Sequence, residues 1–139
     1  MSRHLLLVTC LLILAPLSGC QEHTAGLERS IARADETSAL AALHAIATAE
    51  QTYSISNSGE FGTLKQLAGA GLLPAHYSDD KPLKDYIITL DVTASAYKCN
   101  ADPDSSRQLV GRHLYIDSNS NLIHVNETQP ASASDKAME

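Results

Sequence analysis

Apolar side chains recur along residues 27–53 with the period of an α-helix. Neither Gly nor Pro interrupts this stretch, and it is rich in alanine, the residue with the highest helix propensity. The apolar stripe is formed by Leu40, Leu43, Ile46, Ala47 and Tyr53. Largely outside the stripe fall the polar residues Glu36, His44, Glu50 and Gln51. The pattern predicts one long amphipathic helix, which the polar and glycine-containing segment 56–59 ends.

A second, short helix is predicted at residues 63–68. Thr63 has the side chain of a helix cap, and Leu64 and Leu67 have the spacing of an inward face. Gly69 and Gly71 bracket its end, and a polar loop over residues 75–85 follows.

From residue 86 the apolar period changes to two, which is typical of half-buried strands. Tyr86, Ile88, Leu90 and Val92 alternate with residues of the other face. A tight turn at Ala94-Ser95 pairs Val92 with Tyr97 and Leu90 with Cys99. We predict this register because it places both apolar sets on one face of the sheet.

A second hairpin is predicted between residues 113 and 126. Leu114 and Ile116 alternate with polar residues, the segment 118–121 forms a turn, and Ile123 and Val125 continue the apolar face. From residue 127 to 139 the chain consists mainly of Ser, Ala, Pro and charged residues, a composition that predicts a disordered tail.

These elements predict an α+β fold for residues 27–126. A long N-terminal helix packs on a small antiparallel four-stranded sheet, and a short second helix accompanies them. One helix covering one apolar sheet face buries both apolar stripes at once.

The first nineteen residues have the pattern of an export signal. A short basic start precedes an apolar run over residues 5–15, which is short for a membrane span. The run is followed by Leu17-Ser18-Gly19-Cys20, which resembles the lipobox of bacterial lipoproteins. The resemblance implies cleavage between Gly19 and Cys20 and attachment of lipid to the Cys20 thiol. Residues 20–26 then form a lipidated tether.

Lipidation of Cys20 implies attachment to a bacterial membrane, with the domain in the cell envelope. Gln21 follows the cysteine, and by the same resemblance this favours the outer membrane, facing the periplasm, in an organism that has one. The alternatives are an ordinary secretory signal with a chance cysteine, or an uncleaved anchor.

Composition narrows the class of function. The net charge of −6 argues against a nucleic-acid partner, and the absence of Trp with a single Phe argues against a large aromatic binding platform. Of the three cysteines, Cys10 leaves with the signal and Cys20 carries lipid, so Cys99 has no disulfide partner within the chain.

Residues 35–126 resemble the globular part of type IV pilins and pseudopilins. Residues 39–53 resemble the second half of a pilin's long helix. They are followed by Gly-Thr-Leu-Lys-Gln-Leu-Ala-Gly-Ala-Gly-Leu-Leu-Pro at residues 62–74, and then by a predicted meander of strands. Residues 111–125 resemble the hairpin that closes the meander in pilin-like proteins. The resemblance implies a pilin-like fold and an accessory role in a secretion or pilus-like system.

The chain departs from pilins at its amino terminus. A pilin keeps an apolar segment after the cleavage site, whereas here the apolar run precedes Cys20 and Gln21-Glu22-His23-Thr24 follows it. The Pro-Trp-Gly turn and the aspartate-rich calcium loop of major pseudopilins are absent from the sequence, so no calcium site is transferred. The combination predicts a pilin-like domain that is anchored by lipid.

The remaining candidate chemistry is weak. His113 and His124 share the polar face of the second hairpin and are candidate zinc or copper ligands, but the sequence places no third ligand there, which favours a solvated face. Asp79, Asp80 and Asp85 do not have the spacing of a calcium loop. Cys99 lies on an apolar strand face, where burial makes a thiol inert.

We therefore expect a non-enzymatic envelope lipoprotein with no cofactor and no catalytic residues, which binds an envelope protein partner. The alternative is a small metal- or ligand-binding lipoprotein that uses the His113/His124 face.

Overall fold

The computed structural model describes residues 21–78, 83–107 and 111–138. The signal segment, Gly19, Cys20, Asp79 and Asp80 therefore lie outside the described residues. The chain divides into two units, residues 1–31 and residues 32–139, and the sheet and its core belong to the second unit.

The long helix, α2, extends over Gln21–Ser56. It begins earlier than the predicted start at Leu27, so residues 21–26, predicted to be a tether, are helical. These residues include no Pro, and Gly26 alone disfavours a helix by only about 1 kcal/mol. After Ser56 the chain turns through Gly59, whose φ of 91° is readily adopted by glycine. Among the described residues, no helix is both long enough and apolar enough to cross a membrane.

The short helix, α3, extends over Leu64–Gly69 and confirms the prediction, including its cap. The Thr63 hydroxyl accepts a hydrogen bond from the Gln66 backbone N–H, and the Gln66 side chain accepts one from the Thr63 backbone N–H. This reciprocal pair is a capping box, which satisfies helix donors that would otherwise lack partners. A 3₁₀ turn, η1, follows at Ala75–Ser78.

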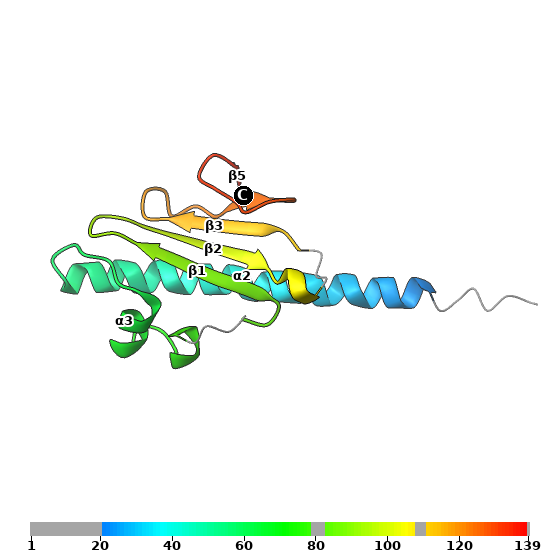
Figure 1. Cartoon of the computed structure of the whole chain (residues 1–139), viewed down its shortest axis with the longest axis horizontal. Helices are drawn as coiled ribbons and strands as arrows, with labels where there is room; N and C mark the ends of the chain where they lie inside the picture. The colour runs from blue at the N-terminus through cyan, green and yellow to red at the C-terminus, as the bar shows by residue number, and fades with distance from the viewer. Residues whose placement is uncertain (1–20, 79–82, 108–110, 139) are drawn as a thin grey trace, which may run out of the picture. The chain divides into compact units, whose positions relative to one another are not determined.

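The sheet contains five antiparallel strands in the order β1-β2-β3-β4-β5 (Figure 1). The strands are β1 (Tyr86–Val92), β2 (Tyr97–Pro103), β3 (His113–Asp117), β4 (His124–Asn126) and β5 (Lys136–Ala137), with a 3₁₀ turn, η2, at Ser105–Arg107. The predicted register of the first hairpin is confirmed, because Val92 pairs with Tyr97 and Leu90 with Cys99. The second hairpin is also present, with Leu114 opposite Val125.

The prediction of four strands was wrong, since the segment predicted to be a disordered tail supplies the fifth. β5 pairs with β4, and the Met138 N–H donates a hydrogen bond of 2.7 Å to the Ile123 carbonyl. Upstream of β5, Ala131 is buried, and its carbonyl accepts a hydrogen bond of 2.8 Å from the Asn100 side chain. These partners lie on β2 and near β4, so the composition of the segment itself did not reveal the strand.

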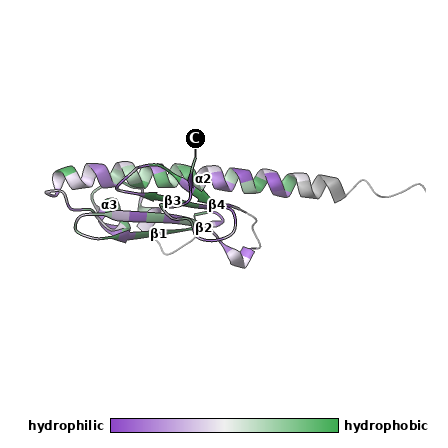
Figure 2. Ribbon diagram, turned by 90° about the horizontal axis from the view of Figure 1, so that it is seen from above, coloured by the Kyte–Doolittle hydropathy of each residue, from purple (hydrophilic) through white to green (hydrophobic). Residues whose placement is uncertain are grey.

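The core lies between the sheet and the part of α2 that begins at Ala32. Figure 2 shows the helix running along one side of the strands. Leu43 and Ile46 of α2 are fully buried, and they share the core with the fully buried sheet residues Cys99, Leu114 and Ile116. At the margin of this layer, Arg112 forms an ion pair with Glu36 of α2, in which the Arg112 Nε lies 3.2 Å from each carboxylate oxygen. One helix face and one sheet face thus bury each other, as predicted.

Candidate functional site

The face of the sheet opposite α2 carries the polar side chains that are candidates for function. We call it the outer face. Strand alternation directs every second residue there, and the register aligns Thr89, Asn100, Tyr115 and His124 in one row across β1 to β4. The C-terminal segment contacts this row through the bond between Asn100 and the Ala131 carbonyl.

His113 and His124 both lie on the outer face, as predicted. His124 is directly opposite Tyr115 on the neighbouring strand, and His113 is opposite Asn126. The His113 Nδ1 lies 2.6 Å from an Asp102 carboxylate oxygen, and the His124 Nδ1 lies 2.7 Å from the Asp135 carbonyl. Each ring is therefore oriented by a hydrogen bond of its own.

The two histidines do not belong to a metal-binding cluster among the described residues. Within the described ranges, no group of three His, Cys, Asp or Glu side chains is arranged to hold a metal ion. Asp85, a candidate calcium ligand, lies 2.8 Å from the Arg107 guanidinium and forms an ion pair with it. Asp102 and Asp117 are likewise engaged by partners within the protein.

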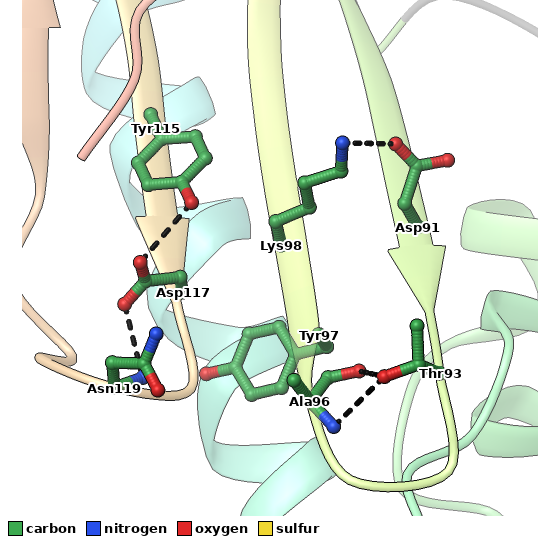
Figure 3. Close-up of a pocket in the computed structure, with 8 residues that line it drawn as sticks. All are labelled: Asp91, Thr93, Ala96, Tyr97, Lys98, Tyr115, Asp117 and Asn119. Atoms are coloured by element: carbon green, nitrogen blue, oxygen red, sulfur yellow. Dashed lines mark hydrogen bonds and ion pairs between the residues drawn. The ribbon is translucent and has the colours of Figure 1, made fainter.

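A shallow pocket of about 210 Å³ opens on the outer face beside the turn between β1 and β2 (Figure 3). Its lining residues are Asp91, Thr93, Ala96, Tyr97, Lys98, Tyr115, Asp117 and Asn119. The Lys98 ammonium lies 3.4 Å from the Asp91 carboxylate, and both side chains are largely exposed. An exposed pair of this kind contributes little to stability. Because both side chains are exposed, their charges are accessible to solutes that enter the pocket.

Asp117 is the buried acid of this pocket. One carboxylate oxygen accepts hydrogen bonds from the backbone N–H groups of Asn119 and Ser120, each of 3.0 Å, and the other accepts one of 3.1 Å from the Tyr115 hydroxyl. Burial by itself raises the pKa of Asp117, but these hydrogen bonds outweigh it, and the pKa lies below its ordinary value of 3.8. Asp117 is therefore an ionised, fully engaged residue that holds the β3–β4 turn.

Cys99 is located as predicted, in the core on the helix-facing side of β2. Its side chain is fully buried, and this burial raises the pKa of the thiol. A protonated, inaccessible thiol is a poor nucleophile. Cys99 has the environment of a small core residue.

Glu50 is the residue that the sequence pattern placed incorrectly. It was expected largely outside the apolar stripe of the helix, yet its side chain is fully buried. Its Oε2 accepts a hydrogen bond of 2.9 Å from the Gly62 N–H, and its Oε1 has no hydrogen-bond partner among the described residues. The signal was available in the spacing, because Glu50 follows Leu43 by seven positions and Ile46 by four, which places all three on one helix face.

Comparison with known proteins places this chain in no family. A scan against protein-family models and searches of the curated proteins and of the solved structures found no match.

Proposed function

We propose that this chain is a membrane-anchored envelope lipoprotein, whose pilin-like domain has a non-enzymatic role in protein interaction. The observation that carries the proposal is the motif Leu17-Ser18-Gly19-Cys20 directly after an apolar run. Lipid attached to Cys20 holds the chain at a membrane, because each buried CH₂ group contributes about 0.8 kcal/mol and two or more chains give stable anchoring.

The fold supports the interaction part of the proposal. A long helix on an antiparallel meander is the arrangement that the resemblance to pilins implies, and on that analogy the domain is an accessory of a secretion or pilus-like system. The partner is an envelope protein, and the exposed side of α2 and the sheet edges are the surfaces available to it. By the resemblance at Gln21, the anchor lies in the outer membrane of an organism that has one.

Substitution of Cys20 by alanine tests the anchor. We expect the wild-type protein to fractionate with membranes and to show a lipid-sized mass increment at its mature amino terminus. The C20A variant is expected to lose both, because no thiol remains at the lipidation position. The measurements are membrane fractionation and intact mass.

The matched control is Cys10→Ala, which removes a cysteine from the apolar run and leaves the lipobox intact. It is expected to behave like the wild type, since residue 10 is discarded with the signal. If the wild-type and C20A proteins behave alike in both measurements, the motif is a coincidence and the apolar run is an ordinary signal or a retained anchor.

A second candidate function, metal or ligand binding at His113 and His124, is supported by one observation. Both imidazoles use Nδ1 in a hydrogen bond to a carboxylate or a carbonyl, which is how metal-ligating histidines are oriented in proteins. Metal analysis of the purified protein separates the two functions. The interaction proposal predicts no stoichiometric metal, whereas bound metal that is lost in an H113A/H124A variant establishes the second function.

A further inference from the structure

Glu50 joins α2 to the loop that leads into α3. The side chain is fully buried, and its Oε2 accepts the hydrogen bond from the Gly62 N–H across that loop. Gly62 is itself packed closely, since a Cβ at this position would lie 3.0 Å from the ring of Tyr53. The neighbouring Phe61 ring makes an edge contact with Tyr97 of β2, with ring centroids 5.2 Å apart. The loop is therefore docked through one hydrogen bond and two close aromatic contacts.

The surroundings of Glu50 do not compensate a negative charge. No ion pair among the described residues involves this carboxyl. The titratable side chains on which its charge acts are Tyr97 and Cys99 of β2, and ionised Glu50 raises the pKa of both. Since both groups are neutral when protonated, neither is a counterion. A buried, unpaired carboxylate is costly, and such a group responds by taking up a proton.

The hydrogen bonding indicates which oxygen carries that proton. Oε2 accepts from Gly62 and is suited to be the carbonyl oxygen, whereas Oε1 accepts no hydrogen bond from the described residues. Protonation of Oε1 therefore removes the charge without disturbing the contact to the loop. Ionisation does not by itself remove the hydrogen bond from Gly62, but it adds a buried charge. The cost of that charge favours movement of the carboxylate into water, and this movement breaks the bond to the loop.

We propose that Glu50 is a proton-controlled clasp, which keeps the α2–α3 loop docked while it is protonated and releases the loop when it ionises. Burial raises the pKa of Glu50 above its ordinary value of 4.5, and the hydrogen bond from Gly62 opposes this rise only in part. Release separates Gly62 from Tyr53 and Phe61 from Tyr97, so a change of protonation at one carboxyl becomes a change in the position of a whole loop.

Hydrogen exchange at the Gly62 amide, measured by NMR on the purified full chain across a pH series, tests the clasp. Above pH 4.5 the protection factor of this amide is expected to fall about tenfold per pH unit, because release is coupled to loss of one proton. The fall ends at the pKa of Glu50 in the docked state. A protection factor that is independent of pH overturns the proposal.

Two variants assign the effect to Glu50. In E50Q, a neutral residue of the same shape, the protection of Gly62 is expected to be independent of pH. In the matched control E60Q, which removes an exposed charge from the same loop, the wild-type pH dependence is expected to persist. A pH dependence that survives in E50Q contradicts the clasp. So does a Glu50 carboxyl carbon resonance that titrates at or below pH 4.5 in the wild type, a measurement that requires no variant.

Discussion

Replacement of Leu43 by alanine is expected to lower the free energy of unfolding by about 2 to 5 kcal/mol, the range for truncation of a large core side chain. Leu43 is fully buried on the face of α2 that covers the sheet, and it belongs to the same core as Leu114 and Ile116. Its truncation removes apolar contacts from helix and sheet together and leaves a cavity between them. The measurement is chemical denaturation followed by circular dichroism.

Ile55→Ala is the matched control for this prediction. Ile55 lies on the same helix, but its side chain is 80% exposed. Its truncation is expected to change the free energy of unfolding by no more than about 0.5 kcal/mol, as for other surface positions. Equal effects of the two substitutions would show that the face of α2 that carries Leu43 does not cover the sheet.

Replacement of Asp117 by alanine is the second large expected effect, with a loss of about 2 to 4 kcal/mol. Hydrogen bonds to a charged group contribute about 1.5 to 3 kcal/mol each and are not additive. The substitution deprives the Tyr115 hydroxyl and the N–H groups of Asn119 and Ser120 of their acceptor, all at the β3–β4 turn. Chemical denaturation at neutral pH measures the loss.

Asp91→Ala is the control, because Asp91 lines the same pocket but is exposed, and its ion pair among the described residues is with Lys98. Its loss is expected to cost less than about 1 kcal/mol, as for surface ion pairs in general. If D91A destabilises the protein as much as D117A, the assignment of the buried anchor to Asp117 is wrong.

The pH dependence of stability distinguishes the two buried acids, because their pKa values are shifted in opposite directions. The pKa of Asp117 is lowered, so its contribution is present above pH 3.8 and is lost as the pH falls below that value. The pKa of Glu50 is raised, so its contribution to the free energy of unfolding is present below pH 4.5. This contribution is lost as the pH rises through the pKa of Glu50 in the folded state. In the D117A variant, the loss of stability below pH 3.8 is expected to disappear. In the E50Q variant, the loss of stability above pH 4.5 is expected to disappear.

Local patterns were sufficient to predict most of the fold. The spacing of Leu43 and Ile46 determines a helical face, and the alternation from Tyr86 to Val92 determines a strand with one apolar side. The cap at Thr63 was predictable because capping involves residues only three positions apart. In each case the partners that decide the structure are neighbours in the chain.

The polar sites were harder to predict, because their partners come from distant segments. The outer-face location of His113 and His124 follows from alternation, but their hydrogen bonds to Asp102 and Asp135 depend on how strands and C-terminal segment come together. In the sequence, Asp117 is a polar residue at the end of the predicted strand that contains Leu114 and Ile116. Its burial and its role in the turn depend on hydrogen bonds that exist only once the turn is formed.

The sequence by itself determined the helix, the first hairpin with its register, and the apolar face that each presents, because these follow from side-chain periodicity within a single element. Only the tertiary structure decided that residues 127–138 add a fifth strand and that Glu50 is enclosed beneath the α2–α3 loop. The physical reason is the same for both. A short polar segment is ordered by partners far along the chain, and a carboxyl on an apolar helix face is buried or exposed according to what packs over it.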